Sequence, residues 1–219
     1  MSISENLKHI KSQLGEGVTL VAVSKYSTNE EIQEAYDAGH RDFGENKAQD
    51  LEVKKDKLPN DIRWHFIGHL QRNKAKYITD FIHLVHAVDS FKLLREINKQ
   101  AKKSNRTIPC LLQMHIAAED TKFGMDESEI ENLIADPKLT ELQNVKVVGL
   151  MGMATNTDDS AKVNSEFKQL KNLFEKLKAA TLPGNVNMEK LSMGMSQDYE
   201  IALENGSTMV RVGTAVFKS

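Results

Sequence analysis

The sequence contains a lysine directly after a short apolar segment: in VTLVAVSKYS, Lys25 follows residues 18–24. We expect such a strand-end lysine to be partly buried, which favours the neutral amine that attacks carbonyl groups. A strand-end lysine more often simply extends its ammonium group into water. The prediction that Lys25 is a nucleophile therefore depends on what the rest of the chain places near it.

Two segments in the last thirty residues carry the residue types that bind phosphate. LSMGMSQD contains Ser192 and Ser196 and precedes an amphipathic segment, and RVGTA contains Gly213 and Thr214. Hydroxyl groups and the backbone N–H groups of glycine-rich turns before a helix bind phosphate well. Together the two segments predict a phosphate site.

A lysine and a phosphate site that lie close together indicate pyridoxal 5′-phosphate (PLP). Its aldehyde forms a Schiff base with lysine, while its phosphate anchors the other end. Arg211 precedes Gly213 by two residues and is predicted to face the pyridine nitrogen and keep it unprotonated. The same residues also suit a phosphosugar enzyme that forms a lysine Schiff base with its substrate, and residue chemistry alone leaves this alternative open.

Short β-branched segments alternate with longer amphipathic ones along the whole chain. After a first helix within residues 1–14, the expected strands cover residues 19–24, 41–44, 62–68, 81–88, 107–116, 145–153, 188–193 and 208–217. The expected helices cover residues 28–39, 46–58, 73–79, 91–104, 126–136, 160–180 and 197–206. Each expected strand except the last is followed by a helix.

This alternation predicts a parallel sheet, and eight units predict an α/β fold: a single (β/α)8 TIM barrel with an extra N-terminal helix, spanning residues 1–219 as one domain. A doubly wound open sheet is the second choice. In a barrel, the residues named above follow the carboxyl ends of strands, where active sites form.

Composition excludes several classes of protein. The formal net charge is −2, without the basic excess of a nucleic-acid-binding protein, and no apolar segment is long enough to span a membrane. The single cysteine, Cys110, is predicted to be a buried strand residue in a reducing compartment. We therefore expect a cytoplasmic protein.

The histidine pairs in HFIGH (His65, His69) and HLVH (His83, His86) suggest a metal site, but they lack the glutamate of a zinc-protease helix. We expect structural or rim histidines and no metal. Four clustered methionines are expected to fill gaps in the core or to line the ligand pocket: Met151, Met153, Met193 and Met195.

The segments AVSK, FGEN, WHFIGHLQRNK, LSMGMSQD and STMVRVGTAVF resemble, in order and spacing, the pyridoxal phosphate homeostasis proteins (the YggS/PROSC family). That family is similar to the barrel domain of alanine racemases. The resemblance implies that Lys25 forms the Schiff base, that Arg211 contacts the ring and that Asn46 lies beside the cofactor. It assigns the phosphate to Ser196, Gly213 and Thr214.

The resemblance also implies a monomeric or weakly associating cytosolic protein that binds PLP, serves PLP-dependent apo-enzymes and has no robust catalysis. His115 stands where relatives commonly have asparagine, although Lys122 and Gly124 fit the family, and the chain ends VFKS without the usual FG and basic tail.

An amino-acid racemase is a further alternative, and it needs a second base opposite the lysine. In alanine racemases a partner subunit and a separate β-domain supply a tyrosine, and we expect this chain to be too short for that domain. Its four tyrosines are Tyr26, Tyr36, Tyr77 and Tyr199.

Overall fold

The computed structural model describes residues 2–119 and 123–218. Within these ranges, eight parallel strands close into a barrel in chain order. The strands are β1 (Thr19–Val23), β2 (Asp42–Glu45), β3 (Arg63–Phe66), β4 (Leu84–Val88), β5 (Ile108–Met114), β6 (Val145–Gly152), β7 (Val186–Ser192) and β8 (Met209–Val212). The predicted (β/α)8 barrel is therefore confirmed, and the open-sheet alternative is wrong.

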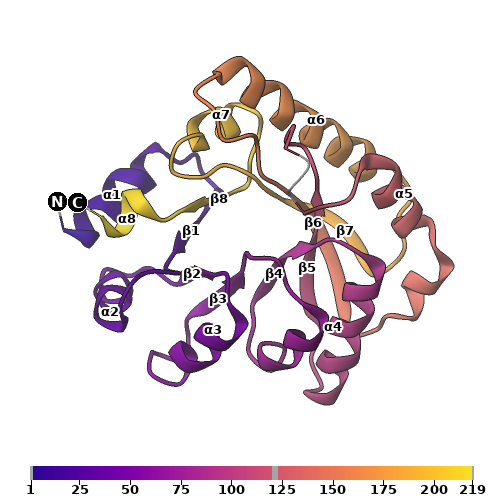
Figure 1. The fold of residues 1–219 in the computed structure, drawn as a ribbon, viewed down its shortest axis with the longest axis horizontal. Helices are drawn as coiled ribbons and strands as arrows, with labels where there is room; N and C mark the ends of the chain where they lie inside the picture. The colour runs from indigo at the N-terminus through magenta and orange to yellow at the C-terminus, as the bar shows by residue number, and fades with distance from the viewer. Residues whose placement is uncertain (1, 120–122, 219) are drawn as a thin grey trace.

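Helices surround the barrel on the outside (Figure 1). The α-helices are α1 (Ile3–Gln13), α2 (Asn29–Asp37), α3 (Ala48–Lys55), α4 (Phe91–Lys103), α5 (Glu127–Ala135), α6 (Ser160–Lys178), α7 (Tyr199–Glu204) and α8 (Thr214–Phe217). Two 3-10 helices, η1 (Arg72–Tyr77) and η2 (Pro137–Glu141), complete the connections. In the ranges that the structure describes, no helix combines the length and the apolar character of a membrane span.

Local sequence signals set the ends of α2 and α4. Thr28 caps α2 and forms a capping box with Glu31, and Gly39 ends the turn with a φ of +84°, a conformation that glycine adopts without strain. Ser90 caps α4 by accepting a hydrogen bond from the backbone N–H of Leu93.

The end of the chain differs from the sequence prediction. The eighth strand stops at Val212, and residues 214–217 form the short helix α8 instead of continuing the strand. β8 pairs with β1 from Thr19↔Met209 to Ala22↔Val212, so strand pairing ends where Gly213 turns the chain. The helix packs beside α1, where the Asn6 amide donates to the Val216 carbonyl at 3.1 Å (Figure 1).

The hydrophobic core has two parts. The larger cluster joins the strands to the surrounding helices. A smaller cluster joins side chains of the neighbouring strands β8 and β1 to side chains of β4, β5 and β6, which lie elsewhere in the barrel: Val21, Leu84, Ala87, Leu111, Val148, Met151 and Met209. Cys110 is fully buried, as predicted, and burial raises the pKa of its thiol.

Candidate functional site

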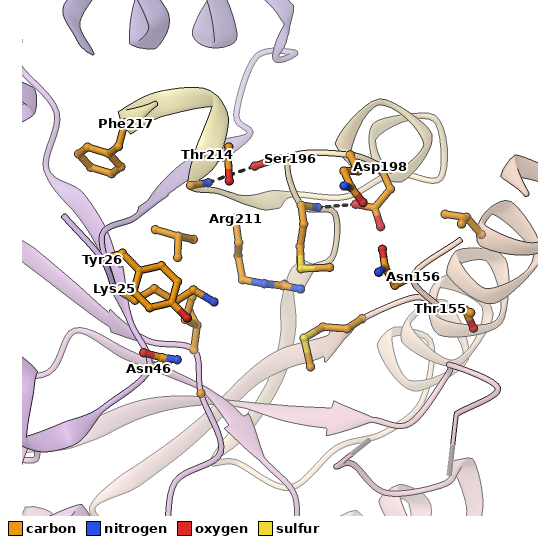
Figure 2. A pocket seen from close by; sticks show the side chains of 18 of the residues that line it. Lys25, Tyr26, Asn46, Thr155, Asn156, Ser196, Asp198, Arg211, Thr214 and Phe217 are labelled. Carbon is orange, nitrogen blue, oxygen red and sulfur yellow. Dashed lines mark hydrogen bonds between the residues drawn. The ribbon is translucent and has the colours of Figure 1, made fainter. Parts of the chain in front are cut away.

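A pocket of about 950 Å³ opens at the carboxyl ends of the strands. Figure 2 shows side chains from both ends of the chain pointing into it, with Lys25 on one side and Arg211 near the centre. Six of the seven residues proposed from the sequence line this pocket: Lys25, Asn46, Ser196, Arg211, Gly213 and Thr214. Barrel closure thus brings together residues that lie up to 189 positions apart, from 25 to 214.

Lys25 lies two residues beyond the end of β1 and is exposed, so the expectation that it is partly buried is wrong. Its Nζ lies 5.0 Å from the centre of the Tyr26 ring, and within the described residues it makes no hydrogen bond or ion pair. An amine without a carboxylate partner is available to a ligand. The reason for its exposure is the open mouth of the pocket, which admits water to the strand end.

A polar clamp outside the barrel holds the strand end that carries Lys25. Lys54, on α3, donates to the Ser24 carbonyl at 2.7 Å and to Glu45 Oε1 at 2.8 Å. The Ser24 hydroxyl donates to the same Glu45 oxygen at 2.6 Å. Because Ser24 and Glu45 are fully buried, this clamp fixes the backbone immediately before Lys25.

Arg211 is buried on β8 yet reaches the pocket wall. Its Nη1 donates to Ser192 Oγ at 2.6 Å and its Nη2 to the Gly152 carbonyl at 3.0 Å. Burial lowers the pKa of Arg211 to about 10, and the charge of Asp198 opposes that shift. The guanidinium therefore stays charged at neutral pH, and its other N–H groups can bind a ligand.

Ser192 is the one proposed residue that does not line the pocket. It is fully buried at the end of β7, where it accepts from Arg211 and contacts His86 Nδ1 at 3.0 Å. The sequence prediction grouped Ser192 with Ser196 in one phosphate loop. Ser192 still belongs to the strand and points into the barrel, whereas Ser196 follows the strand, on the rim.

The loop after β7 and the start of α8 meet at the predicted phosphate site. The backbone N–H of Gly213 donates to Ser196 Oγ at 3.3 Å, which is the dashed line that ends at Ser196 in Figure 2. Gly194 permits the tight loop, since its φ is +96° and a Cβ there would lie 2.6 Å from the Ala202 Cβ. The first N–H groups of α8 have no partner within the helix, which suits an anionic group.

Asn46 enters the pocket because the chain after β3 approaches it closely. A Cβ at Gly68 would lie 2.5 Å from the Asn46 carbonyl oxygen, so only glycine fits at this position. Asn46, Gly68 and Ile67 together form one wall.

Sequence reasoning missed part of the pocket wall. His69 stacks on Phe123 with ring centres 3.8 Å apart, and its Nδ1 lies 3.0 Å from an Asp89 oxygen. Asn156 and Asp158, after β6, also line the pocket. These residues could have been predicted from the sequence only because they follow the ends of expected strands. Lys122 lies outside the described residues.

The methionines divide between the two roles that the sequence allowed. Met151 and Met193 are buried in the core, whereas Met153 and Met195 line the pocket. His115 contacts the Glu119 carbonyl at 3.0 Å and does not line the pocket.

Comparison with known proteins identifies the family. The family model described as alanine racemase, N-terminal domain, matches residues 1–219. A pyridoxal phosphate homeostasis protein from Aquifex aeolicus is 38% identical over 199 residues, which span 90% of this chain and 85% of that relative. The chain belongs to the pyridoxal phosphate homeostasis protein family. The resemblance of its motifs is thus confirmed.

Two further proteins extend the match, one of them a solved structure. The relative from Vibrio alginolyticus is 36% identical over 231 residues, covering 99% of this chain and 97% of its own length. The solved structure of PipY from Synechococcus elongatus with PLP bound superposes with a TM-score of 0.88 at 34% identity, covering 98% of this chain and 99% of PipY.

Proposed function

We propose that this chain is a PLP-binding protein of intracellular PLP homeostasis, with residues 1–219 acting as one PLP-binding domain in the cytoplasm. The observation that carries the proposal is the pocket itself. A lysine amine with no partner among the described residues, hydroxyl and backbone donors and a buried arginine line one cavity. Its PLP-bound relative PipY, similar over almost the whole chain, supports the same ligand here and favours it over a sugar phosphate.

The donor set fits PLP group by group. When bound, PLP supplies an aldehyde that condenses with an amine to a Schiff base with loss of water. Lys25 provides that amine, and Ser196, Gly213 and Thr214 hold the phosphate on the rim. Arg211 donates to the ring nitrogen and keeps it unprotonated, which weakens the ring as an electron sink.

Two neighbouring residues complete the assignment. Asn46 lies beside the ring space, in the wall next to Lys25 (Figure 2). Ser192 does not contact the ligand in this proposal and instead holds Arg211 by accepting a hydrogen bond from it.

The open pocket also suggests how the protein serves PLP-dependent apo-enzymes. Lys25 is exposed, so a second amine can approach the carbon that Lys25 holds. In such an exchange the bond from that carbon to Lys25 would be replaced by a bond to the incoming amine, so the Lys25 amine would be freed and no free aldehyde would enter the water. We propose that a monomer delivers PLP in this way.

Efficient racemisation is not part of the proposal. A racemase needs a general base on each face of the reacting carbon. Among the described pocket residues Tyr26 is the only tyrosine, and it lies beside Lys25 instead of across from it. The Tyr36 and Tyr199 hydroxyls are bonded to Asp61 and Gln13 outside the pocket. With an L-amino acid and PLP, we expect no racemisation above that of the Lys25→Ala variant.

The deciding experiment is an absorption spectrum with PLP before and after borohydride, followed by peptide mapping. A visible band that borohydride removes, with the reduced adduct on Lys25, supports the proposal. An adduct on another lysine refutes the assignment of Lys25. A protein that gives no visible band with added PLP refutes PLP binding altogether, and the Schiff-base phosphosugar enzyme then becomes the better hypothesis.

A further inference from the structure

A chain of hydrogen-bonded side chains crosses the barrel interior and ends on Arg211. We call it the buried relay, and its members are Arg63, Asp42, His65, His86, Ser192 and Arg211. The successive donor–acceptor distances along it are 2.8, 3.0, 2.9, 3.0 and 2.6 Å. It begins at the amino end of the barrel and draws on β2, β3, β4, β7 and β8.

Charge at the start of the relay is fixed by Asp42. Burial raises the pKa of its carboxyl group, but hydrogen bonds from Arg63 and His65 outweigh burial and hold that pKa well below its usual range. Asp42 is therefore an ionised carboxylate that can only accept hydrogen bonds. His65 must donate to it from Nε2.

The remaining proton positions follow one after another. Burial lowers the pKa of both His65 and His86, so each ring is neutral and carries one N–H. His65 has used its N–H on Asp42, so its Nδ1 accepts from His86 Nε2–H. His86 Nδ1 then accepts the hydroxyl proton of Ser192, whose lone pairs are left for Arg211.

The relay helps to stabilise the buried charge of Arg211, on which Asp198 also acts through space. Arg211 is buried, and both of its hydrogen bonds within the described residues go to neutral oxygens, those of Ser192 and Gly152. The four bonds that lead from Arg211 through Ser192, His86 and His65 to Asp42 all point the same way, and hydrogen bonds in such a series polarise one another. The serine oxygen that contacts the guanidinium is thereby a stronger acceptor.

We propose that Asp42, His65 and His86 are positioning residues for Arg211. Through Ser192 they hold the guanidinium so that its remaining N–H groups face the pocket, and they thereby set the selectivity of the pocket for a ring with an unprotonated nitrogen. This inference rests on the proposed function, because it assumes that the ring of PLP occupies the pocket. It adds three residues that lie outside the pocket wall.

A metal site is the competing interpretation of the same residues. Asp42, His65 and His83 place one ligand atom each within 4.8 Å of one another. Arg63 occupies both oxygens of Asp42, however, at 2.8 and 2.5 Å, and His65 has already committed Nε2 to that carboxylate. A cation would have to displace a guanidinium, so the hydrogen-bonded relay is the better account.

The first test needs no cofactor. Nuclear magnetic resonance of the full chain, made with nitrogen-labelled histidine, reads the protonation of each ring nitrogen. Signals are assigned from their loss in the His65→Asn and His86→Asn variants. We expect both rings to be neutral, with hydrogen on Nε2 and none on Nδ1. An imidazolium, or hydrogen on Nδ1 of either ring, would overturn the relay.

The second test measures how the relay acts on the pocket. Dissociation constants are compared for PLP and for an analogue in which C–H replaces the ring nitrogen. His86→Phe removes both hydrogen bonds of the ring, and we expect it to lower the preference for PLP roughly tenfold. His86→Asn keeps an acceptor for Ser192 but loses the bond to His65, so we expect it to keep only part of the preference. His83→Phe is the matched control, since His83 lies beside His65 but outside the relay.

The outcomes separate the inference from the proposed function. If the parent protein binds neither PLP nor the analogue, the proposed function fails. If it prefers PLP and the His86→Phe variant keeps the same preference, the relay inference alone fails. Should His86→Phe not fold, Asp42→Asn replaces it, because it preserves shape and removes the charge. An unchanged preference in Asp42→Asn equally overturns the inference.

Discussion

Charged side chains lie at both ends of this barrel, but they differ in whether they have a hydrogen-bonded or ionic partner. At the carboxyl end, Lys25 has no hydrogen-bonded or ionic partner within the described residues, and it lies open in the pocket. At the amino end, charged groups bind one another: Arg63 binds Asp42, and Arg41 binds Asp61 at 2.9 Å. A group left without a partner is available for ligand binding, whereas a partnered group contributes to folding.

This comparison predicts that substitutions of exposed pocket residues at the carboxyl end, such as Lys25 and Thr214, change PLP binding with little effect on the free energy of unfolding. Substitutions at the amino end should lower the free energy of unfolding with little effect on PLP binding. The buried relay is the exception, because it connects the two ends.

The largest effect is expected at Lys25. Lys25→Ala should abolish the borohydride-reducible PLP adduct, because no other amine has the same position at the end of β1. The free energy of unfolding should change by less than about 0.5 kcal/mol, since the side chain is exposed. Mass spectrometry and urea unfolding measure the two quantities. Lys218→Ala, a second lysine of the pocket wall, is the control and should keep the adduct.

Substitutions at the amino end should lower the stability of the fold. Asp42→Ala leaves buried His65 and the Arg63 guanidinium without their acceptor. We expect the free energy of unfolding to fall by about 3 kcal/mol. Asp61→Ala breaks an exposed ion pair at the same end and should lower the free energy of unfolding by no more than about 1 kcal/mol. Urea denaturation of both variants gives the difference. Equal losses would contradict the contrast between buried and exposed pairs.

A pH effect is expected from His40, which also lies at the amino end. Burial lowers the pKa of His40 from 6.5 to about 4. As pH falls through this interval, the unfolded chain takes up a proton that the folded protein resists, so stability present above pH 6.5 is lost towards pH 4. The full loss from this one group is about 3 kcal/mol.

His40→Gln tests the assignment, because glutamine can still donate to the Asp42 carbonyl but does not titrate. Urea denaturation at a series of pH values should show a shallower decline in this variant. A decline as steep as that of the parent protein would exclude His40 as a contributor.

The smallest effect is expected at Thr214. Thr214→Val removes one hydroxyl from the phosphate site, and we expect PLP to bind roughly fivefold more weakly with stability unchanged. Equilibrium dialysis measures the affinity. Thr107→Val, on an exposed threonine far from the pocket, should bind PLP normally. Unchanged affinity in Thr214→Val would move the phosphate elsewhere.

Several features of the fold were predictable because local sequence encodes them. Alternating apolar segments gave the eight strands, and the Thr28–Glu31 capping box gave the start of α2. Strand 188–193 was placed correctly but begins earlier, at Val186. The end of β8 was misjudged because strand pairing with β1, a contact between the two ends of the chain, decides where the strand stops.

The sequence by itself also determined the chemistry available on the rim: a lysine after β1, hydroxyl and glycine residues after β7 and β8, and an arginine beside them. Only the tertiary structure decided which of these groups remain without partners. Lys25 and Lys54 are both lysines near the same strand end, yet Glu45 binds only Lys54. Ser192 and Ser196 are four residues apart, yet one is buried below Arg211 and the other lines the pocket. Burial and hydrogen-bond partners depend on strands from across the closed barrel, and no local pattern records them.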